Sequence, residues 1–126
     1  MTQEDKEILL KDLCARLPYG VKVESVFINP DTKEHKSCGI EVFDATSLLM
    51  IRDGLGEFKP YLFPLSSMTE EQKEELRMFD SFDTEEIMTL GEWAIRLVDF
   101  YNKYHFDYRG LIEKGLAIDA TNLNVY

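Results

Sequence analysis

The chain has 126 residues, of which 44% are hydrophobic, and it carries a formal net charge of −10. This length suits one domain, residues 1–126, with a single core, and the 8 phenylalanines, 6 tyrosines and one tryptophan exclude a disordered chain. The negative charge argues against direct binding of nucleic acid, because affinity for phosphates comes from clustered Lys and Arg.

Membrane and disulfide-scaffold classes are also disfavoured. No apolar run approaches the roughly 18 residues that a membrane span requires, and the stretch "MTQEDKEILLKDL" is acidic and amphipathic, unlike a signal peptide. We therefore expect a soluble, unexported, cytoplasmic protein with no membrane partner. Two cysteines are too few for a disulfide scaffold, and Cys14 is expected to be a small buried side chain in a helix, while Cys38 stays reduced.

The first element is a helix within residues 2–20. Thr2 can cap it, leucines recur every four residues from Leu9 to Leu17, and a proline followed by Gly20 ends it. Residues 21–28 begin with alternating apolar and polar side chains and are rich in β-branched residues, which predicts a strand.

The middle of the chain predicts the rest of a small sheet. Residues 29–39 form a polar connection, and residues 40–54 are expected to supply one long strand or two short ones, giving an antiparallel meander. Residues 55–65 contain two prolines, which argue against a central strand and favour an edge strand or a crossover on the surface.

Two helices follow, within residues 66–79 and 84–104. The candidate caps of the first are Ser66, Ser67 and Thr69, and those of the second are Asp83 and Thr84. The apolar stripe of the second is formed by Ile87, Leu90, Ala94, Leu97, Val98, Tyr101 and Tyr104. This helix is expected to pack across the sheet and against the first helix, and a single helical turn is expected at 108–114.

The expected fold is therefore α+β. A small antiparallel sheet of about three strands should carry an N-terminal helix and two or three C-terminal helices on one face.

The densest group of reactive side chains is the stretch "HFDYRG". His105, Asp107 and Arg109, with Tyr108, could form a general base oriented by a carboxylate, with an arginine for an anion. Residues two apart do not meet directly, however, so the favoured reading is a structural corner: His105 at a helix end, Asp107 as a cap, and Arg109 paired with it.

Other chemical signatures are weak. His35 and Cys38 are spaced as two metal ligands could be. A zinc site needs four ligands, or three with a water, and the sequence does not supply the others, so no metal and no cofactor is expected. The motifs of hydrolases, nucleotide-binding proteins and zinc proteases are missing.

Acidic residues gather in one part of the chain. Between Thr69 and Glu92 lie nine acidic and two basic residues, which is a net −7 of the total −10. Helix starts explain many of them, but the face could also bind a protein partner. Its candidate binding residues are Glu70, Glu71, Glu74 and Glu75. A second candidate surface is an aromatic-proline edge, with Tyr61 and Phe63 beside Tyr108 and Arg109.

Three stretches resemble an uncharacterised family of small proteins from phages, prophages and mobile elements of gut anaerobic bacteria. They are "KEILLKDLCARLPYGVKV", "KPYLFPLSSMTEEQKEEL" and "HFDYRGLIEKGLAID". The shared motif residues are Lys59, Pro60, Tyr61, Pro64, Ser66, Ser67, Met68, Thr69, His105, Phe106, Asp107, Tyr108, Arg109 and Gly110. The resemblance implies a phage or mobile-element origin but no activity.

The stretches "KPYLFPLSSM" and "HFDYRG" are expected to touch, with Asp107 or Arg109 bonding the connector's backbone. The leading functional expectation is a non-enzymatic protein that binds an unknown protein partner. The alternative is a minor enzyme or a small-ligand-binding domain that uses His105, Asp107 and Arg109 in a pocket between the sheet and the long helix.

Overall fold

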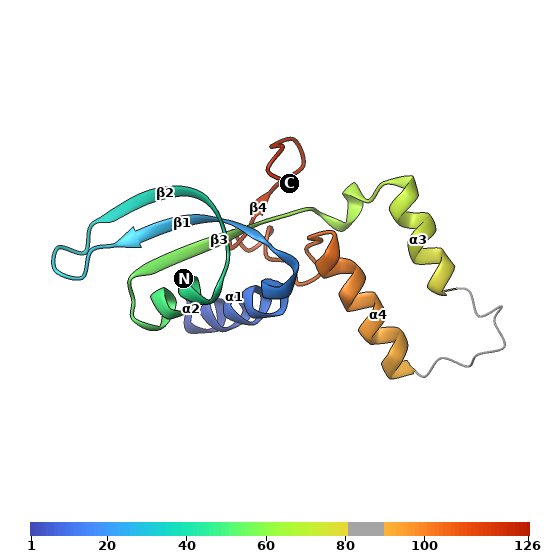
Figure 1. Cartoon of the computed structure of the whole chain (residues 1–126), viewed down its shortest axis with the longest axis horizontal. Coiled ribbons are helices and arrows are strands. Elements are labelled where there is room, and N and C mark those ends of the chain that lie inside the picture. Colours follow the sequence, from blue (N-terminus) through green and yellow to red (C-terminus); the bar gives the residue numbers. More distant parts are fainter. Residues whose placement is uncertain (81–89) are drawn as a thin grey trace.

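The computed structural model describes residues 1–80 and 90–126, which form an α+β fold (Figure 1). The expected fold class is confirmed. In chain order the elements are α1 (Gln3–Arg16), a 3-10 turn (Leu17–Tyr19), β1 (Lys22–Ile28), β2 (His35–Val42), α2 (Ala45–Arg52), β3 (Gly56–Leu62), a second 3-10 turn (Leu65–Ser67), α3 (Glu70–Asp80), α4 (Leu90–Lys103) and β4 (Ile118–Asp119).

The sheet has the strand order β2-β1-β3-β4. β1 is antiparallel to both β2 and β3, whereas the short β4 runs parallel to β3. The expected meander is wrong, because β1 lies between the two strands that follow it along the chain. The parallel strand β4 was not expected.

α1 forms as the sequence predicts. Thr2 caps it reciprocally: its hydroxyl accepts from the Asp5 amide, and the Asp5 carboxylate accepts from the Thr2 amide. Gly20 turns the chain into β1 with a φ of 68°, a left-handed conformation that glycine adopts without strain. Cys14, expected to be buried, is exposed.

The prediction of strands over residues 40–54 is wrong in its second half, which forms the helix α2. The Asp44 carboxylate caps α2 by accepting from the Ser47 amide at 3.0 Å, and the Ser47 hydroxyl accepts from the Asp44 amide at 3.2 Å. This capping box starts a helix where the apolar composition alone suggested a strand. β2, in turn, begins at His35, inside the expected polar connection.

β3 is an interior strand, so the expectation of an edge strand or crossover is wrong. It pairs with β1 on one side and with β4 on the other. Pro60 is fully buried opposite Val23, but β4 pairs only with Tyr61 and Leu62. Pro60 thus lies before the part of β3 that pairs with β4. At this position the missing amide of the proline costs the sheet no hydrogen bond.

The molecule has two regions (Figure 1). We call α1, α2, the sheet and residues 104–126 the body, and the α3–α4 hairpin the arm. The arm extends away from one end of the sheet, so the prediction that the last long helix packs across the sheet is wrong. Thr69 caps α3 reciprocally with Gln72. The expected caps Asp83 and Thr84 lie outside the described residues.

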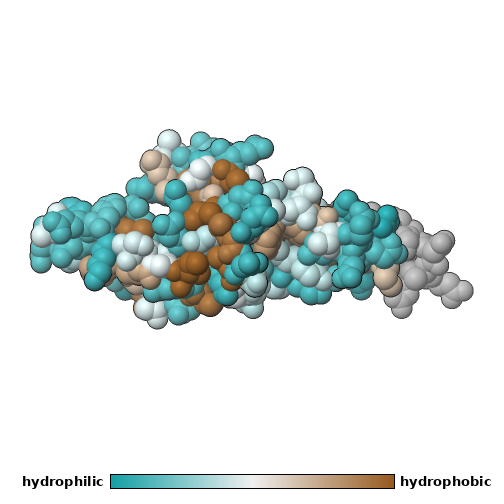
Figure 2. Space-filling model, turned by 90° about the horizontal axis from the view of Figure 1, so that it is seen from above, coloured by the Kyte–Doolittle hydropathy of each residue, from teal (hydrophilic) through white to brown (hydrophobic). Residues whose placement is uncertain are grey.

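The core lies in the body, between α1 and the sheet. Leu9 and Leu13 of α1 meet Val23, Phe58 and residues of the C-terminal segment. The buried cluster consists of Leu9, Leu13, Val21, Val23, Phe43, Phe58, Leu62, Leu111, Leu116 and Ala117. Seen from above, hydrophobic side chains gather over the middle of the molecule, and hydrophilic ones predominate at the end opposite the arm and over the described part of the arm (Figure 2).

Candidate functional site

The corner of residues 105–110 lies beside the proline-containing connector, as expected. Phe63 and Phe106 form an isolated parallel bridge, in which the Phe63 amide donates to the His105 carbonyl and the Asp107 amide donates to the Phe63 carbonyl, both at 2.8 Å. The main chain makes these contacts, so the prediction that the side chain of Asp107 or Arg109 would make them is wrong.

His105 ends α4 in a left-handed conformation, with a φ of 60°. The Phe106 amide donates to the Tyr101 carbonyl and the His105 amide to the Asn102 carbonyl, which is the Schellman pattern of helix ends. The chain uses the same bond pair at Gly54 and at Gly115. His105 therefore occupies a position that glycine fills elsewhere in this protein, and it does so at a cost in backbone strain.

The ring of His105 is held in place by a stack. Its centroid lies 3.9 Å from that of Tyr126, with an angle of 11° between the planes. Nδ1 is buried and has no hydrogen-bond partner among the described residues. Burial, together with the charges of Arg16 and Lys22, lowers the pKa of His105 to about 4, so the ring is neutral at pH 7.

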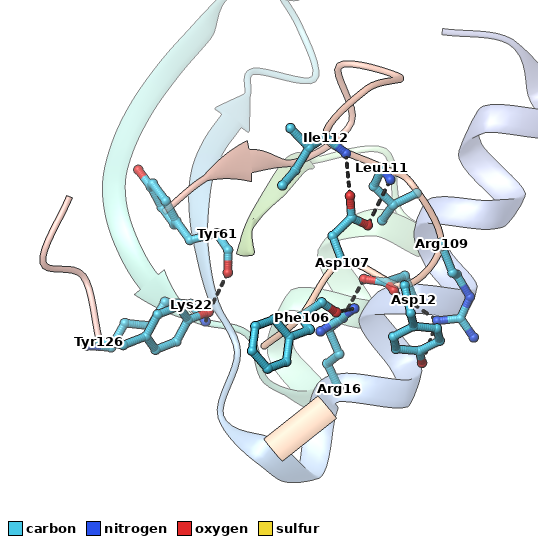
Figure 3. A network of polar contacts seen from close by, with 11 residues as sticks. Asp12, Arg16, Lys22, Tyr61, Phe106, Asp107, Arg109, Leu111, Ile112 and Tyr126 are labelled. Carbon is cyan, nitrogen blue, oxygen red and sulfur yellow. Dashed lines mark hydrogen bonds and ion pairs between the residues drawn. The ribbon is translucent and has the colours of Figure 1, made fainter. Parts of the chain in front are cut away.

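Asp107 caps the turn that follows. Its carboxylate accepts from the amides of Leu111 at 2.8 Å and Ile112 at 3.0 Å (Figure 3). This confirms the expected capping role, because both carboxylate oxygens are engaged by main-chain donors.

Arg109 binds Asp12 of α1, and not Asp107 as expected. Its Nη1 lies 2.9 Å from Asp12 Oδ1, and Arg16 Nε lies 2.7 Å from Asp12 Oδ2. Arg16 Nη2 also donates to the Phe106 carbonyl at 2.6 Å. Asp12 and Arg16 have fully buried side chains, and the Tyr108 ring faces both guanidinium groups. We call Asp12, Arg16, Tyr108 and Arg109 the Asp12 network; Figure 3 labels its three charged members.

The three candidate catalytic residues therefore serve different partners. His105 stacks on Tyr126, Asp107 caps a turn and Arg109 pairs with α1. Sequence reasoning missed Asp12 and Arg16, although a signal was present. With Leu9 and Leu13 they follow the three-to-four spacing of one helix face, which places two charged side chains in the buried stripe.

A second polar contact, which we call the clasp, joins the C-terminal segment to the sheet. The Tyr126 hydroxyl donates to the Tyr61 carbonyl at 2.7 Å and accepts from the Lys22 amide at 2.9 Å (Figure 3). Burial raises the pKa of Tyr126 to about 12, which keeps the hydroxyl protonated and able to donate.

The aromatic-proline edge is not an exposed strip. Tyr61 is only 8% exposed, and Phe63 and Tyr108 are partly buried. The Arg109 guanidinium is engaged with Asp12 and donates to the Tyr108 hydroxyl. These four residues lie at the junction of the connector and the corner, where they hold the body together.

The acidic residues of α3 divide into two sets. Glu70, Glu71 and Glu74 are exposed on the arm. Glu75 instead joins the two helices: its carboxylate binds Lys103 at 3.1 Å and accepts from the Tyr104 hydroxyl, and both bonds lower its pKa. Three of the four candidate glutamates thus remain on an open acidic surface.

His35 and Cys38 lie exposed on β2, where the register makes Cys38 the extra residue of a β-bulge. The described residues hold no group of three or more His, Cys, Asp or Glu side chains placed to bind a metal ion. In the same part of the chain, no helix has the length and apolar character to cross a membrane.

Comparisons of the chain with models of protein families, with curated proteins and with solved structures found no match. The residues of this chain therefore carry the functional evidence.

Proposed function

We propose that the protein is a small, acidic, non-enzymatic cytoplasmic protein of phage or mobile-element origin that binds a partner protein through its arm. One observation carries the binding role: Met78 of α3 and Ile95 and Val98 of α4 are 72%, 64% and 40% exposed. Ile95 and Val98 lie three residues apart on α4 and so share one face of it. Exposed apolar side chains that lie together on a projecting element are typical of a binding surface. The resemblance of the connector and corner stretches supports the origin.

The division of polar contacts supports the arm over the body. In the body, the candidate side chains are already engaged by other groups of the chain, as the Asp12 network and the clasp illustrate. On the arm, Glu70 and Glu74 pair with neighbours one helical turn away, Lys73 and Arg77, at 3.3 and 3.0 Å, and all four side chains are well exposed. Such pairs are weak and leave the carboxylates available to a partner.

The charge of α3 supports a basic partner. Exposed carboxylates beside apolar side chains favour a basic amphipathic segment, whose Lys or Arg side chains meet the glutamates while its apolar side chains cover Met78 and Ile95. Binding should weaken as salt rises, because exposed charges are screened within about 10 Å at 0.1 M salt.

The test is an affinity purification with a matched pair of variants. Tagged wild type, Ile95→Glu and Ile40→Glu are incubated with lysate of a gut anaerobe at 0.15 M and 0.5 M salt, and bound proteins are quantified by mass spectrometry. Ile40 of β2 is 53% exposed, so it matches Ile95 in chemistry and exposure but lies on the body.

We expect a protein that is retained by wild type and Ile40→Glu, lost with Ile95→Glu, and reduced at high salt. Equal retention by both variants, or an empty purification with folded protein, would contradict the proposal.

A minor enzymatic or ligand-binding role for His105, Asp107 and Arg109 has weaker support. The Asp107 carboxylate is occupied by two main-chain amides, and Arg109 is paired with Asp12. A general base needs the group that orients it within hydrogen-bond reach, whereas His105 Nδ1 has no such partner among the described residues.

A further inference from the structure

We propose that the clasp is a reversible contact, in which Tyr126 is an internal ligand of a slot that recognises a tyrosine-containing peptide. Residues 121–126, which we call the strap, carry this internal ligand. The slot is formed by the side chains of Phe63 and His105, the side chain and amide of Lys22, and the Tyr61 carbonyl. None of these residues belongs to the arm, so the proposal is independent of the arm and its partner.

Three side chains of the slot contact the ring of Tyr126. The His105 ring is stacked on it at a centroid distance of 3.9 Å, the Phe63 ring is tilted against it at 5.8 Å, and Lys22 Nζ lies 5.7 Å from its centroid. Stacking and cation–π contacts need the electron-rich face of an aromatic ring, which an aliphatic side chain lacks. The slot therefore selects an aromatic side chain.

Two main-chain groups of the slot engage the hydroxyl. The Lys22 amide donates to the Tyr126 hydroxyl, which in turn donates to the Tyr61 carbonyl (Figure 3). Both groups lie just beyond the Val23–Pro60 pair, at which the β1–β3 ladder ends. A phenol hydroxyl satisfies both because it accepts and donates, whereas a phenylalanine ring leaves both unpaired. Among aromatic side chains, the slot therefore favours tyrosine.

The rest of the strap is lightly held. After β4 the chain loops away from the sheet (Figure 1), and the amides of residues 121–123 bond to the two residues that directly precede this stretch. Leu123 is 49% exposed, and Tyr126 as a whole is 42% exposed although its hydroxyl is engaged on both sides. A segment with few buried contacts opens at a low cost in free energy, so Tyr126 can leave the slot while the body stays folded.

Backbone strain occurs on both sides of the contact. His105 of the slot and Asn124 of the strap have left-handed φ values of 60° and 51°. A glycine in place of His105 would end α4 without strain, but it would have no ring to stack on Tyr126. Strained residues of this kind are typical of ligand clamps and switches. The strain at Asn124 is released when the strap opens, which brings the open and closed states closer in free energy.

The strap also indicates what an external ligand needs. Besides the tyrosine side chain, the strap offers Lys22 Nζ the carbonyl of the preceding residue, Val125. A tyrosine within another peptide has the same ring, hydroxyl and preceding carbonyl, whereas a free phenol lacks the carbonyl. The external ligand is therefore a tyrosine-containing peptide, and the strap and this ligand exclude each other from the slot.

A pair of peptides tests the chemistry of the slot. Full-length Tyr126→Ala has an open slot, and its folding is checked by circular dichroism. The probes are an acetylated and amidated peptide of residues 121–126 and the same peptide with phenylalanine in place of its tyrosine. Binding is followed by the NMR shift of the Lys22 amide, with the Lys36 amide of β2 as the control.

We expect the tyrosine peptide to bind at least about fivefold more tightly than the phenylalanine peptide, because the latter leaves the amide and the carbonyl unpaired. The Lys22 amide should shift and the Lys36 amide should not. Equal binding of the two peptides, or equal shifts of the two amides, would overturn the proposal.

Competition with the strap tests the role of Tyr126 as an internal ligand. Wild type should bind the tyrosine peptide at least about fivefold more weakly than Tyr126→Ala does, because only the fraction of molecules with an open strap can bind. The same affinity for both proteins would show that the peptide binds elsewhere, and would contradict the proposal.

A matched pair of asparagine variants tests the opening of the strap with Tyr126 in place. Asn124→Val puts a β-branched residue at a left-handed position, which disfavours the closed strap, whereas Asn122→Val makes the same change at a position that is not left-handed. We expect Asn124→Val to bind the tyrosine peptide about fivefold more tightly than wild type, and Asn122→Val to differ from it by less than about twofold. Equal affinities of the two variants would refute the strap as the element that controls the slot.

Discussion

The body and the arm use the same kinds of charged side chain in opposite ways. In the body, Asp12 is fully buried and binds two arginines, one of which is also fully buried. On the arm, Glu70 binds Lys73 with side chains that are 83% and 49% exposed. Removing one partner of a buried pair leaves an uncompensated charge out of water, whereas removing one partner of an exposed pair leaves a hydrated one. Burial therefore decides which pairs hold this protein together.

The substitution Asp12→Asn is the strongest test of this difference between buried and exposed ion pairs. The substitution leaves Arg16 buried without its counter-charge, so the free energy of unfolding should fall by about 3–5 kcal/mol. The matched change on the arm, Glu70→Gln, should lower it by less than about 0.5 kcal/mol. Urea denaturation followed by circular dichroism measures both. Similar small losses in the two variants would refute the role assigned to the Asp12 network.

His105 makes the stability of the body depend on pH. Its pKa is lowered from 6.5 to about 4, so the unfolded chain binds a proton at a higher pH than the folded chain does. The stabilisation from neutral His105 is therefore complete above about pH 6.5 and is lost as pH falls toward 4. Because the ring is only partly buried and solvent screens it, the loss should stay below about 3 kcal/mol.

His105→Asn isolates this effect, because asparagine tolerates the left-handed backbone but does not titrate. Carboxylates also contribute to acid unfolding, so the measured quantity is the difference between wild type and variant across pH 4–7. We expect that difference to change with pH. A constant offset would show that burial does not control the titration of His105.

Tyr126→Phe tests the clasp. The substitution leaves the Tyr61 carbonyl and the Lys22 amide without their partner, which should cost about 1–2 kcal/mol. Tyr19→Phe is the control, because Tyr19 makes an exposed hydrogen bond to Asp99 at 2.6 Å and should matter less.

The clasp also predicts behaviour in alkali. The pKa of Tyr126 is raised from 10.0 to about 12, so its stabilisation is complete below about pH 10 and is lost as pH rises toward 12. Thermal melting across this range should show a steeper loss for wild type than for Tyr126→Phe. Parallel curves would contradict a hydroxyl that stays protonated because the Tyr61 carbonyl and the Lys22 amide hold it.

The substitution Glu75→Gln, on the arm, should have the smallest effect of the variants described. Glu75 joins α3 to Lys103 and Tyr104 of the neighbouring helix and turn, at the surface. We expect amide hydrogen exchange in α3 to rise a few-fold while exchange in β1 and β3 stays the same, because the arm can open without the body. Equal acceleration in both regions would show that the two regions unfold as one unit.

Local signals in the sequence predicted the local structure. Capping residues and the spacing of apolar residues were sufficient to predict α1 and the start of α3. The alternation of apolar and polar residues was sufficient to predict β1. The capping box at Asp44 and Ser47 is an equally local signal for a helix. The apolar, β-branched composition of the segment nevertheless led to the prediction of a strand. Pro60 misled for a different reason, since its tolerance depends on where β4 begins, more than fifty residues further along the chain.

The candidate site was less predictable because its partners are distant. "HFDYRG" was recognised as a corner and the capping role of Asp107 was expected, but the partner of Arg109 lies 97 residues earlier. No spacing rule within one helix or strand connects such residues. The buried face of α1 did carry a clue, since Asp12 and Arg16 share it with Leu9 and Leu13. Their burial becomes explicable only once residues 106–109 are in place.

The Asp12 network also has a consequence for the order of folding. Arg16 and the Phe106 carbonyl are separated by 90 residues. The helix α1 can therefore form early, with Asp12 and Arg16 paired to each other but without the Phe106 carbonyl and Arg109. During synthesis α1 emerges first, and the body cannot close until residues 106–109 have left the ribosome. Until then, α1 presents an apolar face interrupted by a carboxylate and a guanidinium, which makes it a poor nucleus for aggregation.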